Sequence, residues 1–235
     1  MKLIRILFVF ALIGLLGFSW PFSWLFTNTA NNASYGSDAW VKKEIQILKS
    51  QARNIDDKVL RLALTAYMNA NKRGYVRNQM LTVIDYSKPS TEKRLWVFDL
   101  KKNRTLYNTW VSHGKNSGLI NATSFSNSPG SLKSSLGVFQ TADTYLGKNG
   151  YSLRLHGLDR GINDYAYSRA IVIHGAPYAN PANISSYGRI GRSWGCPAVD
   201  SKLAKPIINT IKERSIVFAY YPDRKLLASS RFLTA

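Results

Sequence analysis

Cysteine is nearly absent from this sequence of 235 residues: the chain has one, Cys196, and three histidines. A single cysteine excludes an intrachain disulfide framework and a zinc centre built from several cysteines. It is either a thiol kept for chemistry or an incidental buried side chain. Cys196 lies in "GRSWGCPAVD", residues 191–200. Its neighbours Gly195 and Pro197 are atypical of a packed strand interior, which favours a thiol kept for chemistry.

Acidic residues are also scarce, since 13 Asp and Glu stand against 32 Lys and Arg and give a formal net charge of +19. Such a charge favours an anionic partner, which can be nucleic acid, anionic lipid or an acidic polymer such as a cell wall. The basic residues are scattered, with only short groups such as Lys42–Lys43 and Lys101–Lys102. A nucleic-acid surface is expected to carry a denser cluster interleaved with aromatic residues, so we expect no nucleic-acid partner.

Charge is missing from one long stretch at the N-terminus. Lys2 and Arg5 precede the uncharged residues 6–26, "ILFVFALIGLLGFSWPFSWLF". This pattern predicts a signal peptide over residues 1–26, and the run is equally long enough to remain as a membrane anchor. The structural alternative, in which this segment is a buried core helix, agrees poorly with its N-terminal position and with the basic residues before it. Either favoured interpretation places the rest of the chain outside the cytoplasmic membrane, in the periplasm or cell wall.

The chain behind this segment divides into three parts. Residues 27–37 are small and polar and predict a linker. Residues 38–75 predict a helical lead, with Asn54 as a candidate helix cap and Gly74 as a stop signal. Short β-type runs follow, at residues 81–86, 94–100, 105–113, 136–141, 151–155, 170–174 and 216–221.

The β-rich part also has features that are not strands. Residues 114–135 are rich in Gly, Ser and Asn and predict a long loop, of a length that is often functional. A helix is predicted at about 205–213 with Pro206 in its first turn, and residues 224–235 are interpreted as a C-terminal tail. We therefore expect a mainly β, mostly antiparallel domain with one or two short helices, preceded by a small helical segment.

His174 ends the apolar run "AIVI", which is typical of a buried strand, so its ring is expected to emerge where the strand meets solvent. The carbonyl of Gly175 can accept a hydrogen bond from one ring nitrogen and leave the other nitrogen facing a thiol. A cysteine nucleophile requires such a base, and donors for the oxyanion. Gly195 permits a sharp turn that aims backbone N–H groups at an oxyanion beside Cys196.

Other interpretations of these residues stay open at this point. Cys196 can be a small buried hydrophobe, and His174 a structural histidine. A zinc site made from the histidines and Cys196 has no close H-x-H or C-x-x-C spacing to support it.

The two stretches "IVIHG" and "GRSWGCPAVD" together resemble the murein L,D-transpeptidases, whose catalytic segment runs from a His-Gly pair to Ser/Thr-x-Gly-Cys. The wider stretches "TVIDYSKPSTEKRLWVFDL", "VSHGKNSG", "ATSFSNSPGSLKSSLGVF" and "GYSLRLHGLDRGIND" are similar to one branch of that family. The resemblance covers about residues 81–223 and implies a catalytic domain of β-sandwich or barrel type over residues 76–223. The chain departs from the broad family at Pro197 and Ala198, where an aliphatic residue and an arginine are usual.

The resemblance implies a role for each matching residue. Cys196 would be the nucleophile, His174 the general base and Gly175 the source of the orienting carbonyl. Gly195 and Cys196 would lend N–H groups to the oxyanion. Further roles are implied for residues around the turn: Ser193 would brace it, Trp194 and Arg192 would contact the peptide stem, and His113 would either face the cleft or be structural. No metal or organic cofactor is implied.

Three functions remain open from the sequence. The first is an exported transpeptidase acting on peptidoglycan stem peptides through a thioester on Cys196. The second is a carboxypeptidase or amidase with the same Cys–His pair and water as the acceptor. The third is a non-catalytic, basic module that binds the cell wall. The sequence determines neither the acceptor nor the oligomeric state.

Overall fold

The computed structural model describes residues 34–234, and Tyr35 onward forms one compact unit. This unit begins with two helices, α1 (Asp38–Gln51) and α2 (Asp57–Lys72). Ser37 caps α1 by accepting a hydrogen bond from the Trp40 N–H. Asp56 caps α2 by accepting from the N–H groups of Lys58 and Val59. Both caps satisfy N–H groups that the first helical turn leaves without partners.

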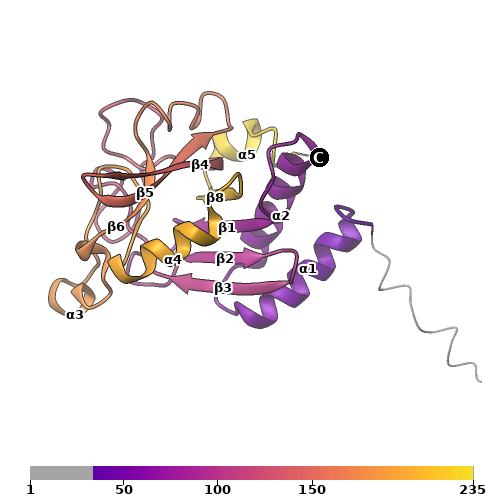
Figure 1. The fold of residues 1–235 in the computed structure, drawn as a ribbon, viewed down its shortest axis with the longest axis horizontal. Coiled ribbons are helices and arrows are strands. Elements are labelled where there is room, and N and C mark those ends of the chain that lie inside the picture. The colour runs from indigo at the N-terminus through magenta and orange to yellow at the C-terminus, as the bar shows by residue number, and fades with distance from the viewer. Residues whose placement is uncertain (1–33, 235) are drawn as a thin grey trace, which may run out of the picture. The chain divides into compact units, whose positions relative to one another are not determined.

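A sheet of eight strands forms the centre of the unit, in the order β3-β2-β1-β8-β4-β5-β6-β7 (Figure 1). Most neighbouring strands are antiparallel, whereas the pairs β1/β8 and β6/β7 are parallel. The strands are β1 (Met80–Asp85), β2 (Leu95–Asp99), β3 (Arg104–Thr109), β4 (Gly137–Gly147), β5 (Gly150–Gly157), β6 (Val172–Gly175), β7 (Ala198–Val199) and β8 (Ile216–Tyr220). The predicted β fold class is confirmed, and each of the seven predicted runs overlaps one strand. The ends differ most at β3, which stops at Thr109 rather than residue 113, and at β4, which continues to Gly147 rather than residue 141.

Helices cover the sheet and close the core. α2 packs on β1 and β8, while α4 (Ser201–Ile211) packs on β6, β5 and β1. β1 is buried at every residue except Met80 because it contacts both helices. The short elements η2 (Pro177–Ala179) and α3 (Asn183–Tyr187) follow β6.

The structure corrects the predicted start of α4. The helix begins at Ser201 rather than near Lys205, because the Asp200 side chain accepts a hydrogen bond from the Lys202 N–H and caps the helix there. Pro206 therefore lies inside the helix and not in its first turn. Asp is a common N-cap residue, but the prediction placed the helix start from Pro206, which favours the first turn, and so did not use Asp200.

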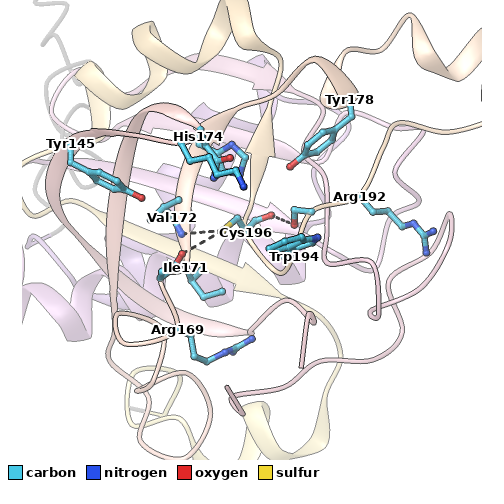
Figure 2. Close-up of a pocket in the computed structure, with 13 residues that line it drawn as sticks. Tyr145, Arg169, Ile171, Val172, His174, Tyr178, Arg192, Trp194 and Cys196 are labelled. Atoms are coloured by element: carbon cyan, nitrogen blue, oxygen red, sulfur yellow. Dashed lines mark hydrogen bonds between the residues drawn. The ribbon is translucent and has the colours of Figure 1, made fainter. Parts of the chain in front are cut away.

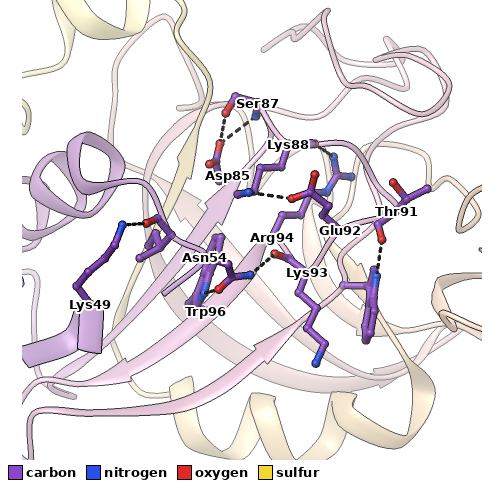
Figure 3. Close-up of polar contacts among 12 residues, drawn as sticks. Lys49, Asn54, Asp85, Ser87, Lys88, Thr91, Glu92, Lys93, Arg94 and Trp96 are labelled. Carbon is purple, nitrogen blue, oxygen red and sulfur yellow. Dashed lines mark hydrogen bonds and ion pairs between the residues drawn. The ribbon is translucent and has the colours of Figure 1, made fainter. Parts of the chain in front are cut away.

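Asn54 does not cap α2, because its side chain is used elsewhere. Its Oδ1 accepts a hydrogen bond from Trp96 Nε1 at 3.1 Å, and its Nδ2 donates to the Lys93 carbonyl at 3.2 Å (Figure 3). Asn54 thus joins the turn between the two N-terminal helices to the start of β2. Asp56, two residues later, takes the capping position.

Residues 224–235, interpreted from the sequence as a tail, contain helix α5 (Arg224–Ser229). The side chain of Phe232 is completely buried. Asn69 of α2 donates hydrogen bonds to the carbonyls of Phe232 and Thr234, at 3.0 Å each. The end of the chain is therefore packed against the N-terminal helices.

The predicted signal peptide or anchor over residues 1–26, and most of the predicted linker, lie outside the described residues. Within residues 34–234, none of the helices combines the length and hydropathy needed to span a bilayer.

Candidate active site

Strand pairing brings His174 and Cys196 to the same place. β6 and β7 are parallel neighbours in which His174 pairs with Ala198. Cys196 lies two residues before Ala198, so it lies level with Val172 at the start of β6, two residues before His174 on that strand. Both residues line one cavity of about 390 Å³. Figure 2 shows Cys196 among the lining residues, with His174 and Tyr178 above it and Arg169 below.

The ring of His174 is held by its own neighbour in sequence. His174 Nδ1 lies 2.9 Å from the Gly175 carbonyl oxygen, as the sequence led us to expect. A carbonyl only accepts, so Nδ1 carries the proton and Nε2 is left as a free acceptor. Burial lowers the pKa of His174 below its ordinary value, and the bond to Gly175 opposes this in part. The imidazole is therefore neutral at pH 7 and able to accept a proton.

The thiol of Cys196 is half-buried and lies between backbone groups. The Val172 N–H donates to Sγ at 3.5 Å, and Sγ lies 3.6 Å from the Ala170 carbonyl, to which the thiol donates. Burial raises the pKa of the Cys196 thiol, while the Val172 N–H and the positive charge of Arg169 lower it in part. The thiol therefore keeps its proton at neutral pH.

Ser193 braces the turn that carries the cysteine. Its hydroxyl donates to the Cys196 carbonyl at 2.6 Å and accepts from the Gly195 N–H at 3.0 Å. The second bond corrects one expectation, because the Gly195 N–H is already occupied and is not free for an oxyanion. The Cys196 N–H forms no hydrogen bond with any residue from 34 to 234, so it remains the donor candidate.

Trp194 and Arg192 both line the cavity, but in different ways. The Trp194 side chain is 71% exposed, and the Lys115 ammonium lies 5.8 Å from its ring centroid. Arg192 Nη1 donates to the carbonyls of Lys115 and Gly118, at 2.8 and 3.0 Å. Arg192 thus ties the start of the 114–135 loop to the cavity wall.

Sequence reasoning missed Arg169, which holds the other end of that loop. Its guanidinium donates four hydrogen bonds there, to Ser126 O, Ser135 Oγ, Ser131 Oγ and Lys133 O, at distances of 2.5 to 3.1 Å. Arg169 also lines the cavity. The one available signal was a charged residue directly before the buried strand that ends in His174.

Tyr178, Tyr145, Lys148 and Asn149 were missed as well, although all four line the cavity. Burial, the nearby Cys196 and a hydroxyl contact with Ser112 leave the pKa of Tyr178 raised to about 12, so its phenol stays protonated. The remaining three lie at the β4–β5 hairpin, far from Cys196 in sequence. No local motif marks them.

His113 does not face the cleft. It is completely buried and does not line the cavity. Arg94 Nη2 lies 2.8 Å from His113 Nδ1, and His113 Nε2 lies 3.3 Å from the Gly118 carbonyl. Arginine only donates, so Nδ1 accepts and the ring is neutral. Burial and the Arg94 charge lower the pKa of His113 to about 4. His113 is therefore structural and supports the loop.

The third histidine, His156, also lies outside the cavity lining and stacks on Tyr167, with ring centroids 4.4 Å apart. In the part of the chain that is described, no group of three or more His, Cys, Asp or Glu side chains is arranged to hold a metal ion. The zinc alternative thus finds no ligand set there.

A half-buried thiol and a neutral imidazole with a fixed tautomer, opening on one cavity, are what nucleophilic cysteine chemistry requires. The family model of the L,D-transpeptidase catalytic domain matches residues 51–220, and the chain belongs to this family. It therefore carries a transpeptidase catalytic domain. A search of curated proteins gave no significant match.

Similar solved structures are distant. They include an L,D-transpeptidase from Mycobacterium smegmatis, with 13% identity, a TM-score of 0.39, and 61% of this chain and 59% of that chain covered. A structure of the LD transpeptidase LdtMt1 in complex with imipenem has the same values. An L,D-transpeptidase from Stackebrandtia nassauensis has 11% identity and a TM-score of 0.34, with 79% and 78% covered. The chain thus covers less than two thirds of the first two proteins.

Proposed function

We propose that this protein is an exported cysteine acyltransferase that acts on the stem peptides of peptidoglycan. The observation that carries the proposal is the shared cavity of Cys196 and His174, with His174 Nδ1 bound to the Gly175 carbonyl. Membership in the L,D-transpeptidase catalytic domain family supports the substrate class. The basic N-terminal residues before the apolar run at 6–26 support export.

In the first half of the reaction, His174 Nε2 takes the thiol proton as Cys196 Sγ attacks the carbonyl of the third, diamino residue of a tetrapeptide stem. The Cys196 N–H is the candidate donor to the resulting oxyanion. Collapse of the tetrahedral intermediate breaks the peptide bond and expels the terminal D-alanine. The leaving amine receives its proton from His174, and a thioester remains on Cys196.

In the second half, the amine of another stem attacks the thioester and gives up a proton to His174. The new amide bond is a 3–3 cross-link, and the thiol recovers its proton. Water as the acceptor would give hydrolysis with the same residues.

The positive charge of the chain suits an anionic wall polymer. Residues 34–234 form two ion pairs, Lys49–Asp57 and Lys88–Glu92. Most lysine and arginine side chains within residues 34–234 therefore have no acidic partner that neutralises their charge, and the net charge favours an anionic surface.

The proposal predicts a thioester on one residue. The full-length protein, incubated with a disaccharide-tetrapeptide, is expected to gain the mass of the acyl group and release D-alanine, and Cys196→Ala is expected to do neither. A dimer lacking one D-alanine would demonstrate transfer, and a tripeptide alone would demonstrate hydrolysis. A carbapenem is expected to add its whole mass to the wild type but not to Cys196→Ala.

Two outcomes would count against catalysis by Cys196. One is release of D-alanine by Cys196→Ala at the wild-type rate. The other is an inert wild type that still binds the wall, which would favour the non-catalytic module. Ser229→Ala, on the exposed side of α5, serves as a control variant that should react like the wild type.

A further inference from the structure

The charge of the cavity lining is of one sign. Of the 13 residues that line it, three are cationic, namely Lys148, Arg169 and Arg192, and none is Asp or Glu. A concave site with a single sign of charge focuses its field and favours a ligand of the opposite sign. The cavity therefore suits a ligand that carries an anionic group.

The two arginines are committed to the protein itself. Arg169 donates four hydrogen bonds to residues 126–135, and Arg192 donates two to the carbonyls of Lys115 and Gly118. These bonds fix both guanidinium groups as parts of the wall that hold the 114–135 loop. A ligand that recruited either group fully would have to compete with bonds that the loop needs.

Lys148 differs from both arginines. It stands with Asn149 in the two-residue turn of the β4–β5 hairpin, since Gly147 pairs with Gly150 across the ladder. The tight turn, with Gly150 at φ +72°, fixes the backbone of Lys148 at the rim of the cavity. Its ammonium is exposed and forms no hydrogen bond or ion pair with residues 34–234. The amide of Asn149 likewise has no hydrogen-bond partner in this part of the chain.

We propose that the β4–β5 turn is a carboxylate subsite, in which Lys148 binds the C-terminal carboxylate of the donor peptide and the Asn149 amide donates a second hydrogen bond. The inference rests on the proposed function, because it concerns the peptide that Cys196 attacks. Every tetrapeptide donor carries this carboxylate on the D-alanine that is expelled, one residue beyond the scissile carbonyl. The flexible stem of lysine lets the ammonium reach that carboxylate. The charge-assisted hydrogen bond between them strengthens binding of a peptide whose C-terminus lies at this turn.

The test compares two synthetic donors that share the scissile bond, a tetrapeptide with a free C-terminal carboxylate and the same tetrapeptide with a C-terminal amide. Thioester formation by the full-length protein is followed by intact mass. The wild type is expected to show a KM about tenfold lower for the acid, with similar kcat, because the contact acts in ground-state binding. Lys148→Gln is expected to have about the same KM for both donors, and Lys148→Arg is expected to retain most of the preference for the acid.

The control variant is Lys102→Gln, which removes an exposed lysine at the β2–β3 turn, and β1 and β8 lie between this hairpin and β4 in the strand order. It should keep the tenfold preference. A wild type that forms thioester with equal KM for both donors, or a Lys148→Gln variant that keeps the preference, would overturn the subsite and leave the proposed function standing. Failure of the wild type to form thioester with either donor would overturn both.

Discussion

The thiol of Cys196 and the imidazole of His174 have pKa values shifted in opposite directions, and burial is the main cause of both shifts. The cysteine pKa is raised, so the thiol stays protonated. The histidine pKa is lowered, so the ring stays neutral. The resting pair at pH 7 is therefore thiol and imidazole rather than thiolate and imidazolium. A neutral pair requires His174 to remove the proton as the bond to the substrate forms.

The sign of the His174 shift predicts the acid limb of the pH profile. Because protonated His174 cannot act as a base, kcat/KM for thioester formation should fall as the pH drops through the lowered pKa, that is, below about 6.5. Activity should stay level through pH 7, since the cysteine pKa is raised. Initial acylation rates between pH 4 and 8 at constant ionic strength would measure this, and a limb centred above pH 7 would contradict the neutral pair.

At the scale of the element, the turn from Ser193 to Cys196 depends on one hydroxyl and one glycine. Ser193 Oγ joins the Gly195 N–H to the Cys196 carbonyl. Gly195 has φ +123°, and a Cβ there would lie 2.8 Å from the Lys133 carbonyl. Both the backbone conformation and the close approach of the 114–135 loop therefore require glycine at this position.

Ser193→Ala is expected to loosen this turn. The variant loses two hydrogen bonds, each contributing about 1 kcal/mol to stability, so the free energy of unfolding should fall by about 2 kcal/mol. Thioester formation should slow because the cysteine is less well positioned, while the fold remains. Denaturant unfolding and acylation kinetics measure the two effects, with Ser193→Thr as the control that keeps the hydroxyl. An alanine variant with wild-type stability and rate would show that the bonds do not brace the turn.

On the scale of the whole molecule, the last described residues pack against the end of α2 and the residues that follow it. Asn69 of α2 binds the carbonyls of Phe232 and Thr234, and the ring of Phe232 packs edge-on to Tyr75 at a centroid distance of 5.8 Å. The guanidinium of Arg73 lies 5.4 Å from the centroid of the same ring. The last residues are therefore part of the folded unit and not an appendage.

Phe232→Ala is expected to destabilise the protein by about 3–5 kcal/mol, because it removes a completely buried aromatic ring and leaves a cavity. Thermal unfolding followed by circular dichroism measures the loss. Ser229→Ala on the exposed side of α5 should leave the melting temperature within about 1 °C of the wild type, since exposed substitutions have small effects. Equal melting temperatures for the two variants would contradict this packing.

Periodicity and local motifs were sufficient for most of the sheet and for the central pair. Alternating or continuous apolar runs predicted seven strands, because each strand of the core must bury at least one face. β7 was missed since two residues are too few to show a pattern. The His174–Gly175 contact and the turn at Gly195–Cys196 could be predicted because each depends on residues that are adjacent in the sequence.

The sequence by itself determined the β fold class, the place of Cys196 in a glycine turn and the carbonyl partner of His174. Only the tertiary structure decided that Arg169 and Lys148 join the cavity, that His113 does not, and that the Gly195 N–H is occupied. These outcomes depend on contacts between segments far apart in the chain, such as the 114–135 loop and the residues around β6. A local pattern reports which face of an element is buried, but it cannot report which distant side chain will lie against it.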